Sequence, residues 1–109
     1  MTRRKELDPL VRTSGLILDL KLADLRRASL ACEESRARLA DLATGPVETD
    51  LPFSVAAKTG LLYDRWAEAR RAEINLTLAR QTATWIDARM AARIAFGRAE
   101  ALRKLAGDS

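Results

Sequence analysis

The sequence has 109 residues, of which 20 are Ala, 17 are Leu and 15 are Arg. These three residue types are strong helix formers, and five Gly and three Pro supply few of the turns that a β-sandwich or barrel requires. The composition therefore favours one all-helical domain. The sequence contains no His and a single cysteine, Cys32. This excludes disulfide frameworks, His/Cys metal clusters and His-based acid–base catalysis.

The net charge of +4 is unevenly distributed along the chain. Residues 1–43 carry nine basic and seven acidic side chains, whereas residues 54–109 carry ten basic and six acidic ones. A basic C-terminal half is compatible with an acidic protein, a nucleic acid or an anionic membrane surface, although the interleaved acids favour an ordinary solvated helix surface. There is no apolar run of 18 residues and no signal-peptide pattern after the basic start. The sequence therefore predicts a cytoplasmic location without membrane insertion.

The first predicted helix covers about residues 9–43. Asp8 can cap its start by accepting hydrogen bonds from the first backbone N–H groups, and Pro9 is tolerated at the first helical position. Gly45-Pro46 ends the helix. A strict spacing of seven predicts a seam for a partner helix. Its row is Val11, Leu18, Leu25, Cys32 and Leu39, flanked by Leu22, Ala28, Leu42 and Ala43.

The second predicted helix covers about residues 51–106, after a connection at 44–50 that is short enough to join antiparallel neighbours. Asp50 and Pro52 repeat the start signal, and Gly60 marks a point where the helix could kink or begin. The bulky residues recur every eleven positions, which predicts one slowly drifting apolar stripe. They are Tyr63, Ile74, Trp85 and Phe96. The predicted fold is thus an antiparallel two-helix coiled-coil hairpin, 1–109, whose second helix is longer than the first.

The predicted helices differ in length, about 52 Å against about 84 Å at 1.5 Å per residue. Folded back from the connection, Pro9 would reach the level of residues 83–87, which leaves the end of the second helix without an intramolecular partner. This overhang is basic and partly apolar, so we predict that it binds another protein. The predicted partner-binding residues are Arg89, Arg93, Phe96, Arg98, Leu102, Arg103 and Leu105.

The sequence carries no motif for catalysis or for cofactor binding. There is no phosphate-binding glycine motif, and the pairs Asp19/Asp24 and Glu33-Glu34 lack the shaped pocket that paired carboxylates need for acid–base work. Cys32 lies on the seven-residue row and is interpreted as a core residue. We therefore predict a protein that is not an enzyme and has no catalytic or metal-binding residues, no cofactor and no small-molecule substrate.

Three runs in the first helix resemble the FliJ and YscO group of bacterial proteins. They are Leu7-Asp8-Pro9-Leu10-Val11-Arg12, Ala23-Asp24-Leu25-Arg26-Arg27-Ala28 and Ala37-Arg38-Leu39-Ala40-Asp41-Leu42. The run from Arg98 to Leu105 is similar to the way in which such chains end. The resemblance implies an antiparallel two-helix coiled coil of the flagellar or type III secretion export apparatus.

The resemblance also implies a stalk that sits in the centre of a hexameric export ATPase, stimulates or assembles it, and contacts the export gate. The working end would be the terminal end of the hairpin, and the protein would be cytoplasmic, at the periphery of the export apparatus. Two alternatives stay open from the residues alone. One is a structural coiled coil that self-associates into a homo-oligomer, and the other is a basic helical nucleic-acid binder.

Overall fold

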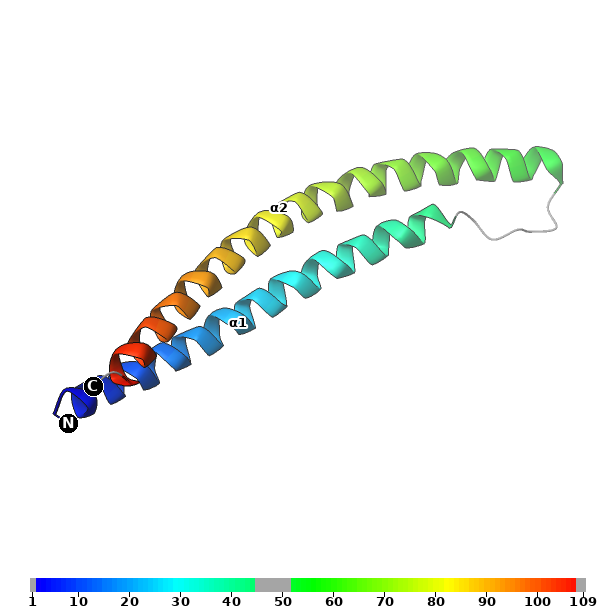
Figure 1. Cartoon of the computed structure of the whole chain (residues 1–109). Coiled ribbons are helices and arrows are strands. Elements are labelled where there is room, and N and C mark those ends of the chain that lie inside the picture. Colours follow the sequence, from blue (N-terminus) through cyan, green and yellow to red (C-terminus); the bar gives the residue numbers. More distant parts are fainter. Residues whose placement is uncertain (1, 45–51, 108–109) are drawn as a thin grey trace. The chain divides into compact units, whose positions relative to one another are not determined.

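The computed structural model confirms the all-helical class and the longer second helix (Figure 1). It describes residues 2–44 and 52–107. Helix α1 spans Thr2–Ala43 and has 42 residues, and helix α2 spans Phe53–Gly107 and has 55. The described residues contain no strand.

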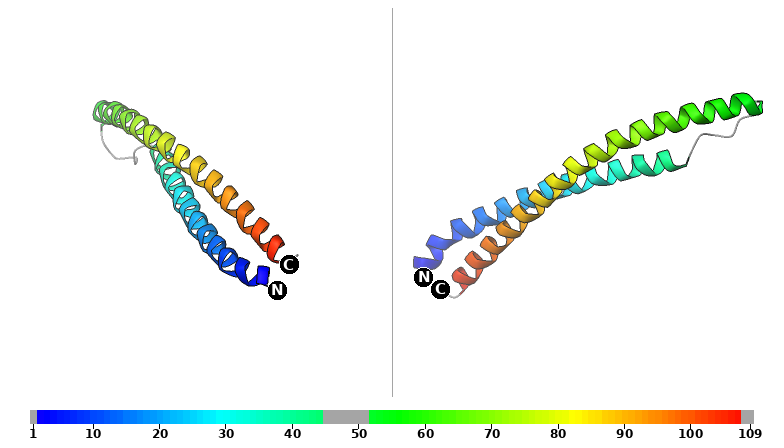
Figure 2. Two further views of the ribbon diagram at one scale, coloured as in Figure 1. Left: turned by 90° about the vertical axis from the view of Figure 1, so that its left-hand side faces the viewer. Right: turned by 90° about the horizontal axis from the view of Figure 1, so that it is seen from above.

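Contacts divide the described residues into two units, each built from both helices. Unit 1 contains α1 up to Leu30 and α2 from Thr82, and unit 2 contains Ala31–Gln81. Within each unit the two helix stretches run in opposite directions, and in unit 1 the start of α1 and the end of α2 lie at the same end (Figure 1, Figure 2). The predicted antiparallel hairpin pairing is therefore present in each unit.

Helix α1 begins at Thr2 and not at Pro9 as predicted. Pro9 lies inside the helix, where it costs one backbone hydrogen bond because it has no N–H. Leu7 is half-buried and lies one turn before the half-buried Val11. The packing of Leu7 in unit 1 thus offsets the cost of the proline and lengthens the helix by two turns.

The end of α1 is capped by Thr44, whose backbone N–H and Oγ1 hydroxyl donate to the Asp41 carbonyl oxygen at 3.3 and 2.7 Å. The predicted break at Gly45-Pro46 and the predicted Asp50 cap lie outside the described residues. At the start of α2, the Ala56 N–H donates to the Pro52 carbonyl oxygen at 2.8 Å. From Phe53 onward α2 runs without interruption through Gly60.

The seam of α1 follows the predicted seven-residue row. Cys32 is buried, and Val11, Leu18, Leu25 and Leu39 are half-buried. The structure adds a second row, four residues before the first, which completes the alternating spacing of a heptad seam. That row consists of Leu7, Ser14, Lys21, Ala28, Ser35 and Leu42. Ala28 and Leu42 were expected beside the seam and are buried, whereas Leu22 and Ala43 are exposed, contrary to expectation.

The predicted eleven-residue stripe of α2 fails at Phe96, which is 56% exposed, whereas Ile74 is buried and Tyr63 and Trp85 are half-buried. Buried and half-buried positions instead follow two rows with a spacing of seven. One row is Ala67, Ile74, Gln81, Ala88, Ala95 and Leu102, and the other is Leu78, Trp85, Ala92, Ala99 and Ala106. The eleven-residue pattern followed the bulky side chains, whereas the helix is buried mainly through its alanines.

The predicted C-terminal overhang is also wrong. In unit 1 Ala92, Ala95 and Ala99 are buried, so the last turns of α2 are paired with α1. The error lies in the register. A tight turn at 44–50 would place Ser35 opposite about residue 59, whereas its hydroxyl donates to Oε1 of Gln81.

The unpaired stretch of α2 is its beginning, in unit 2. None of the side chains described between Phe53 and Leu62 is buried. The last buried residue of α1, Leu42, clusters with Ala67 and Ile74 further along α2. The displaced register thus moves the excess length of α2 from its C-terminal to its N-terminal end.

Small side chains dominate the core. Within residues 2–44 and 52–107, eight of the ten buried residues are Ala, Ser or Cys, and the other two are Leu42 and Ile74. Such side chains allow helix axes to approach toward about 8 Å, the short end of the range for packed helices. Most large apolar side chains lie outside this core. Among the described residues, 17 of them are exposed. Far more of the large apolar residues are therefore exposed than are buried between the two helices.

We expect Ala95→Leu to lower the free energy of unfolding by about 1–3 kcal/mol, because added methylenes overpack a tight seam. Ala101→Leu is the matched control, since Ala101 is exposed six residues further along α2, and should change stability by less than about 0.5 kcal/mol. Urea denaturation followed by circular dichroism measures both. Equal shifts for the two variants would contradict the small-residue seam.

Candidate protein-binding surface

Four of the seven predicted partner-binding residues lie on one face of α2 in unit 1. Arg89, Arg93, Phe96 and Arg103 are spaced by four, three and seven residues, which places them along one line of a helix. All four are exposed. We call this line the Arg–Phe stripe.

Two of the arginines in the Arg–Phe stripe are held by neighbours on α2. The Arg89 guanidinium carbon lies 5.5 Å from the centroid of the Trp85 ring, a cation–π contact. Arg103 Nη1 lies 2.8 Å from Glu100 Oε1, in an ion pair that is largely exposed and hence weakly stabilising. Arg93 makes no ion pair with another residue of the described ranges. Its positive charge is therefore available to an acidic partner.

Phe96 supplies the apolar element of the Arg–Phe stripe. It lies one turn after Arg93 and is 56% exposed. An exposed aromatic ring between arginines is the composition typical of residues that dominate the affinity of protein interfaces. The stripe thus combines an apolar anchor with positive charge on a regular helix.

The other three predicted residues do not share this surface. Leu102 is half-buried on the seam, so it packs within unit 1. Arg98 lies two residues from Phe96, a rotation of about 200°, and therefore faces away from the stripe. Leu105 lies seven residues after Arg98, on the same side as that arginine, and is 48% exposed.

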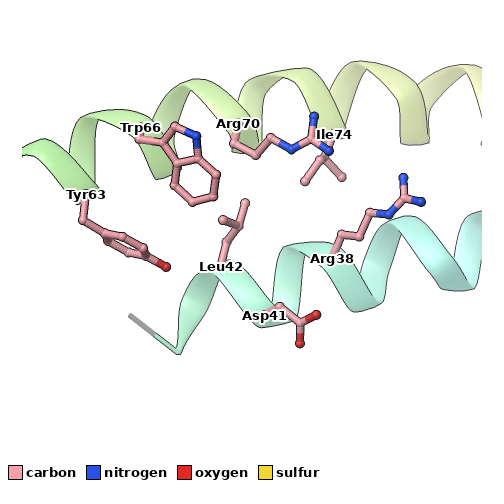
Figure 3. A pocket seen from close by; sticks show the side chains of 7 residues that line it. All are labelled: Arg38, Asp41, Leu42, Tyr63, Trp66, Arg70 and Ile74. Atoms are coloured by element: carbon pink, nitrogen blue, oxygen red, sulfur yellow. The ribbon is translucent and has the colours of Figure 1, made fainter. Parts of the chain in front are cut away.

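A second surface, in unit 2, was missed by the sequence interpretation. A cleft of about 340 Å³ is lined by Leu42, Tyr63, Trp66 and Ile74 and is shown in Figure 3. Trp66 is 56% exposed, and its ring centroid lies 5.7 Å from that of Tyr63. We call this hollow the Trp66 cleft. The only sequence signal for it is the excess length of the second helix, which was assigned to the wrong end.

The described residues do not meet the requirements of a metal site, a disulfide or a membrane span. Among the described residues no group of three His, Cys, Asp or Glu side chains is placed to hold a metal ion. Cys32 is buried and forms no disulfide. In the described part of the chain no helix is long and apolar enough to cross a membrane.

No protein-family model, curated protein or solved structure matches the chain.

The exposure of the stripe predicts a contrast between two neighbouring truncations. Phe96→Ala should change the free energy of unfolding by less than about 0.5 kcal/mol, because Phe96 is exposed. Leu102→Ala should cost about 1–2 kcal/mol, because Leu102 is half-buried on the seam. Thermal and urea denaturation measure both. A larger loss of unfolding free energy for Phe96→Ala than for Leu102→Ala would contradict the exposure of Phe96.

Proposed function

We propose that this chain is a non-enzymatic helical protein that acts by binding another protein through the Arg–Phe stripe. The observation that carries the proposal is the exposure of Phe96 among arginines on a regular face of α2. A helix face of this kind fits a groove or pore lined by apolar and acidic side chains. The most specific partner that we propose is a hexameric export ATPase of the flagellar or type III secretion apparatus.

Two further observations support this partner. The runs in α1 that resemble the FliJ and YscO group imply a stalk in the centre of such an ATPase. The start of α1 and the end of α2 lie at the same end of unit 1 (Figure 1), so both helix ends of the pair, and the stripe leading to them, can enter one opening.

The proposed mechanism involves no chemical step by this chain. Phe96 would be buried in the partner and supply much of the affinity, while Arg89, Arg93 and Arg103 would steer association toward acidic loops and set the orientation. A stalk that binds one arrangement of the ATPase subunits more tightly than others shifts the ring toward that arrangement. Assembly or ATP turnover would increase as a result, and protein export with it.

The proposal is tested with point variants, because truncation of α2 would remove buried residues such as Ala99. We expect Phe96→Ala and Arg93→Glu each to weaken binding to the purified export ATPase of the same genome at least about tenfold and to reduce its stimulation. Arg98→Glu carries the same charge change on the other side of the helix and should have a much smaller effect. Binding is measured by fluorescence anisotropy and stimulation by phosphate release.

A salt titration separates this function from nucleic-acid binding. Binding to single-stranded oligonucleotides falls steeply with salt because counterions are released, whereas a contact anchored by Phe96 should fall much less. Stripe variants that bind and stimulate the ATPase as well as the unchanged chain would refute the proposed partner. Tighter, steeply salt-dependent binding to oligonucleotides would favour the basic nucleic-acid binder.

A further inference from the structure

We propose that the Trp66 cleft of unit 2 binds an acidic amphipathic helix of a partner protein. An apolar side chain of that helix would lie against Trp66 and Leu42, and a carboxylate on the same face would lie between Arg38 and Arg70. The cleft is made only of residues from unit 2. The proposal therefore does not depend on the Arg–Phe stripe or on the export ATPase.

The apolar part of the cleft is already assembled. Leu42 and Ile74 are buried and form its floor, and Tyr63 packs against their cluster. The Trp66 ring points toward Leu42 in Figure 3 yet is 56% exposed. A preformed floor beside an exposed indole offers a large area to a partner side chain at little cost in conformational entropy.

The charged part of the cleft indicates an acidic occupant. Arg38 and Arg70 line it together with Asp41, and in Figure 3 both guanidinium groups lie at its Ile74 end, whereas the Asp41 carboxylate points away from α2. Arg70 Nη1 pairs with Glu73 Oε2 at 3.0 Å, and its side chain is 44% exposed. Arg38 forms no ion pair within the described part of the chain. Two guanidinium groups at one end of an apolar cleft complement a carboxylate with bidentate geometry.

The surface beside the cleft indicates that the occupant is a helix of about three turns. Leu62 lies one turn before Trp66 on α2 and is 64% exposed, and Leu61 is 61% exposed. Together with Val55 they border a second hollow of about 500 Å³. This is the stretch of α2 without buried residues, so a partner helix could continue along α2 from the cleft.

A partner protein is favoured over a second copy of this chain by charge. A symmetric dimer through the cleft would bring Arg38 and Arg70 of one copy against the same two arginines of the other, and like charges disfavour that contact. A second copy is therefore an outcome that the experiment must distinguish.

The experiment uses the full chain and a fluorescein-labelled helical peptide of about 16 residues. The peptide carries leucines three and four residues apart on one face, with glutamates on the same face one turn beyond. A matched peptide has lysine in place of each glutamate. We expect fluorescence anisotropy to show binding of the glutamate peptide and at least about tenfold weaker binding of the lysine peptide.

Two pairs of variants locate the binding site. Trp66→Ala should weaken binding of the glutamate peptide at least about tenfold. Leu76 is 55% exposed and lies outside the cleft, so Leu76→Ala is the control and should leave this binding unchanged. The double variant Arg38→Glu/Arg70→Glu should reverse the preference and bind the lysine peptide better. Arg65→Glu/Arg71→Glu makes the same charge change outside the cleft and should keep the original preference.

Unchanged circular dichroism spectra establish that the variants fold, and sedimentation of the unliganded chain tests for a second copy. The proposal is overturned if Trp66→Ala binds the glutamate peptide normally, or if the two peptides bind equally. A dimer that Trp66→Ala dissociates would assign the cleft to a second copy and overturn it as well. Phe96→Ala should leave peptide binding unchanged, so failure at the cleft is distinguishable from failure at the stripe.

Discussion

The seam of small side chains is the constraint on which the rest of the structure depends. Alanine, serine and cysteine at the buried positions let two helices approach closely but bury little apolar area per residue. The seam is consequently sensitive to added volume and contributes little hydrophobic free energy at each position. The large residues that would normally form the core of a hairpin, such as Leu20, Met90 and Phe96, lie on its exposed faces instead.

A polar contact in the seam of unit 2 helps to specify which residues pair. Ser35 is 1% exposed, and its hydroxyl donates to the Gln81 side chain. A seam of similar alanines discriminates poorly between registers, because a shift of one heptad replaces one small residue by another. A shifted register would place Ala88 or Ile74 opposite Ser35, and the hydrogen bond between the Ser35 hydroxyl and the Gln81 side chain would be lost. Ser35 and Gln81 thus stabilise the observed register against its neighbours.

The sequence predicted the helical class, two helices, the end of α1 and one row of its seam, because these depend on helix propensity, on a capping signal and on the spacing of apolar residues. It did not predict the start of α1, because Pro9 is a start signal that the packing of Leu7 overrides. The positions of bulky residues do not predict the seam of α2, because Phe96 is exposed and Ala95 is buried. No local pattern encodes the register, which depends on contacts between residues such as Ser35 and Gln81 that lie far apart in the chain.

The register of the two helices also determines which residues form the candidate surfaces. The predicted overhang puts Leu102 on the partner-binding surface, and correction of the register moves it to the seam. Arg93 and Phe96 remain exposed in either register, because they lie on a face of α2 that α1 does not cover. The same correction leaves the beginning of α2 without a partner in unit 2 and opens the cleft beside Trp66. A displacement of the pairing by about six turns therefore decides which apolar residues stabilise the hairpin and which are available to other proteins.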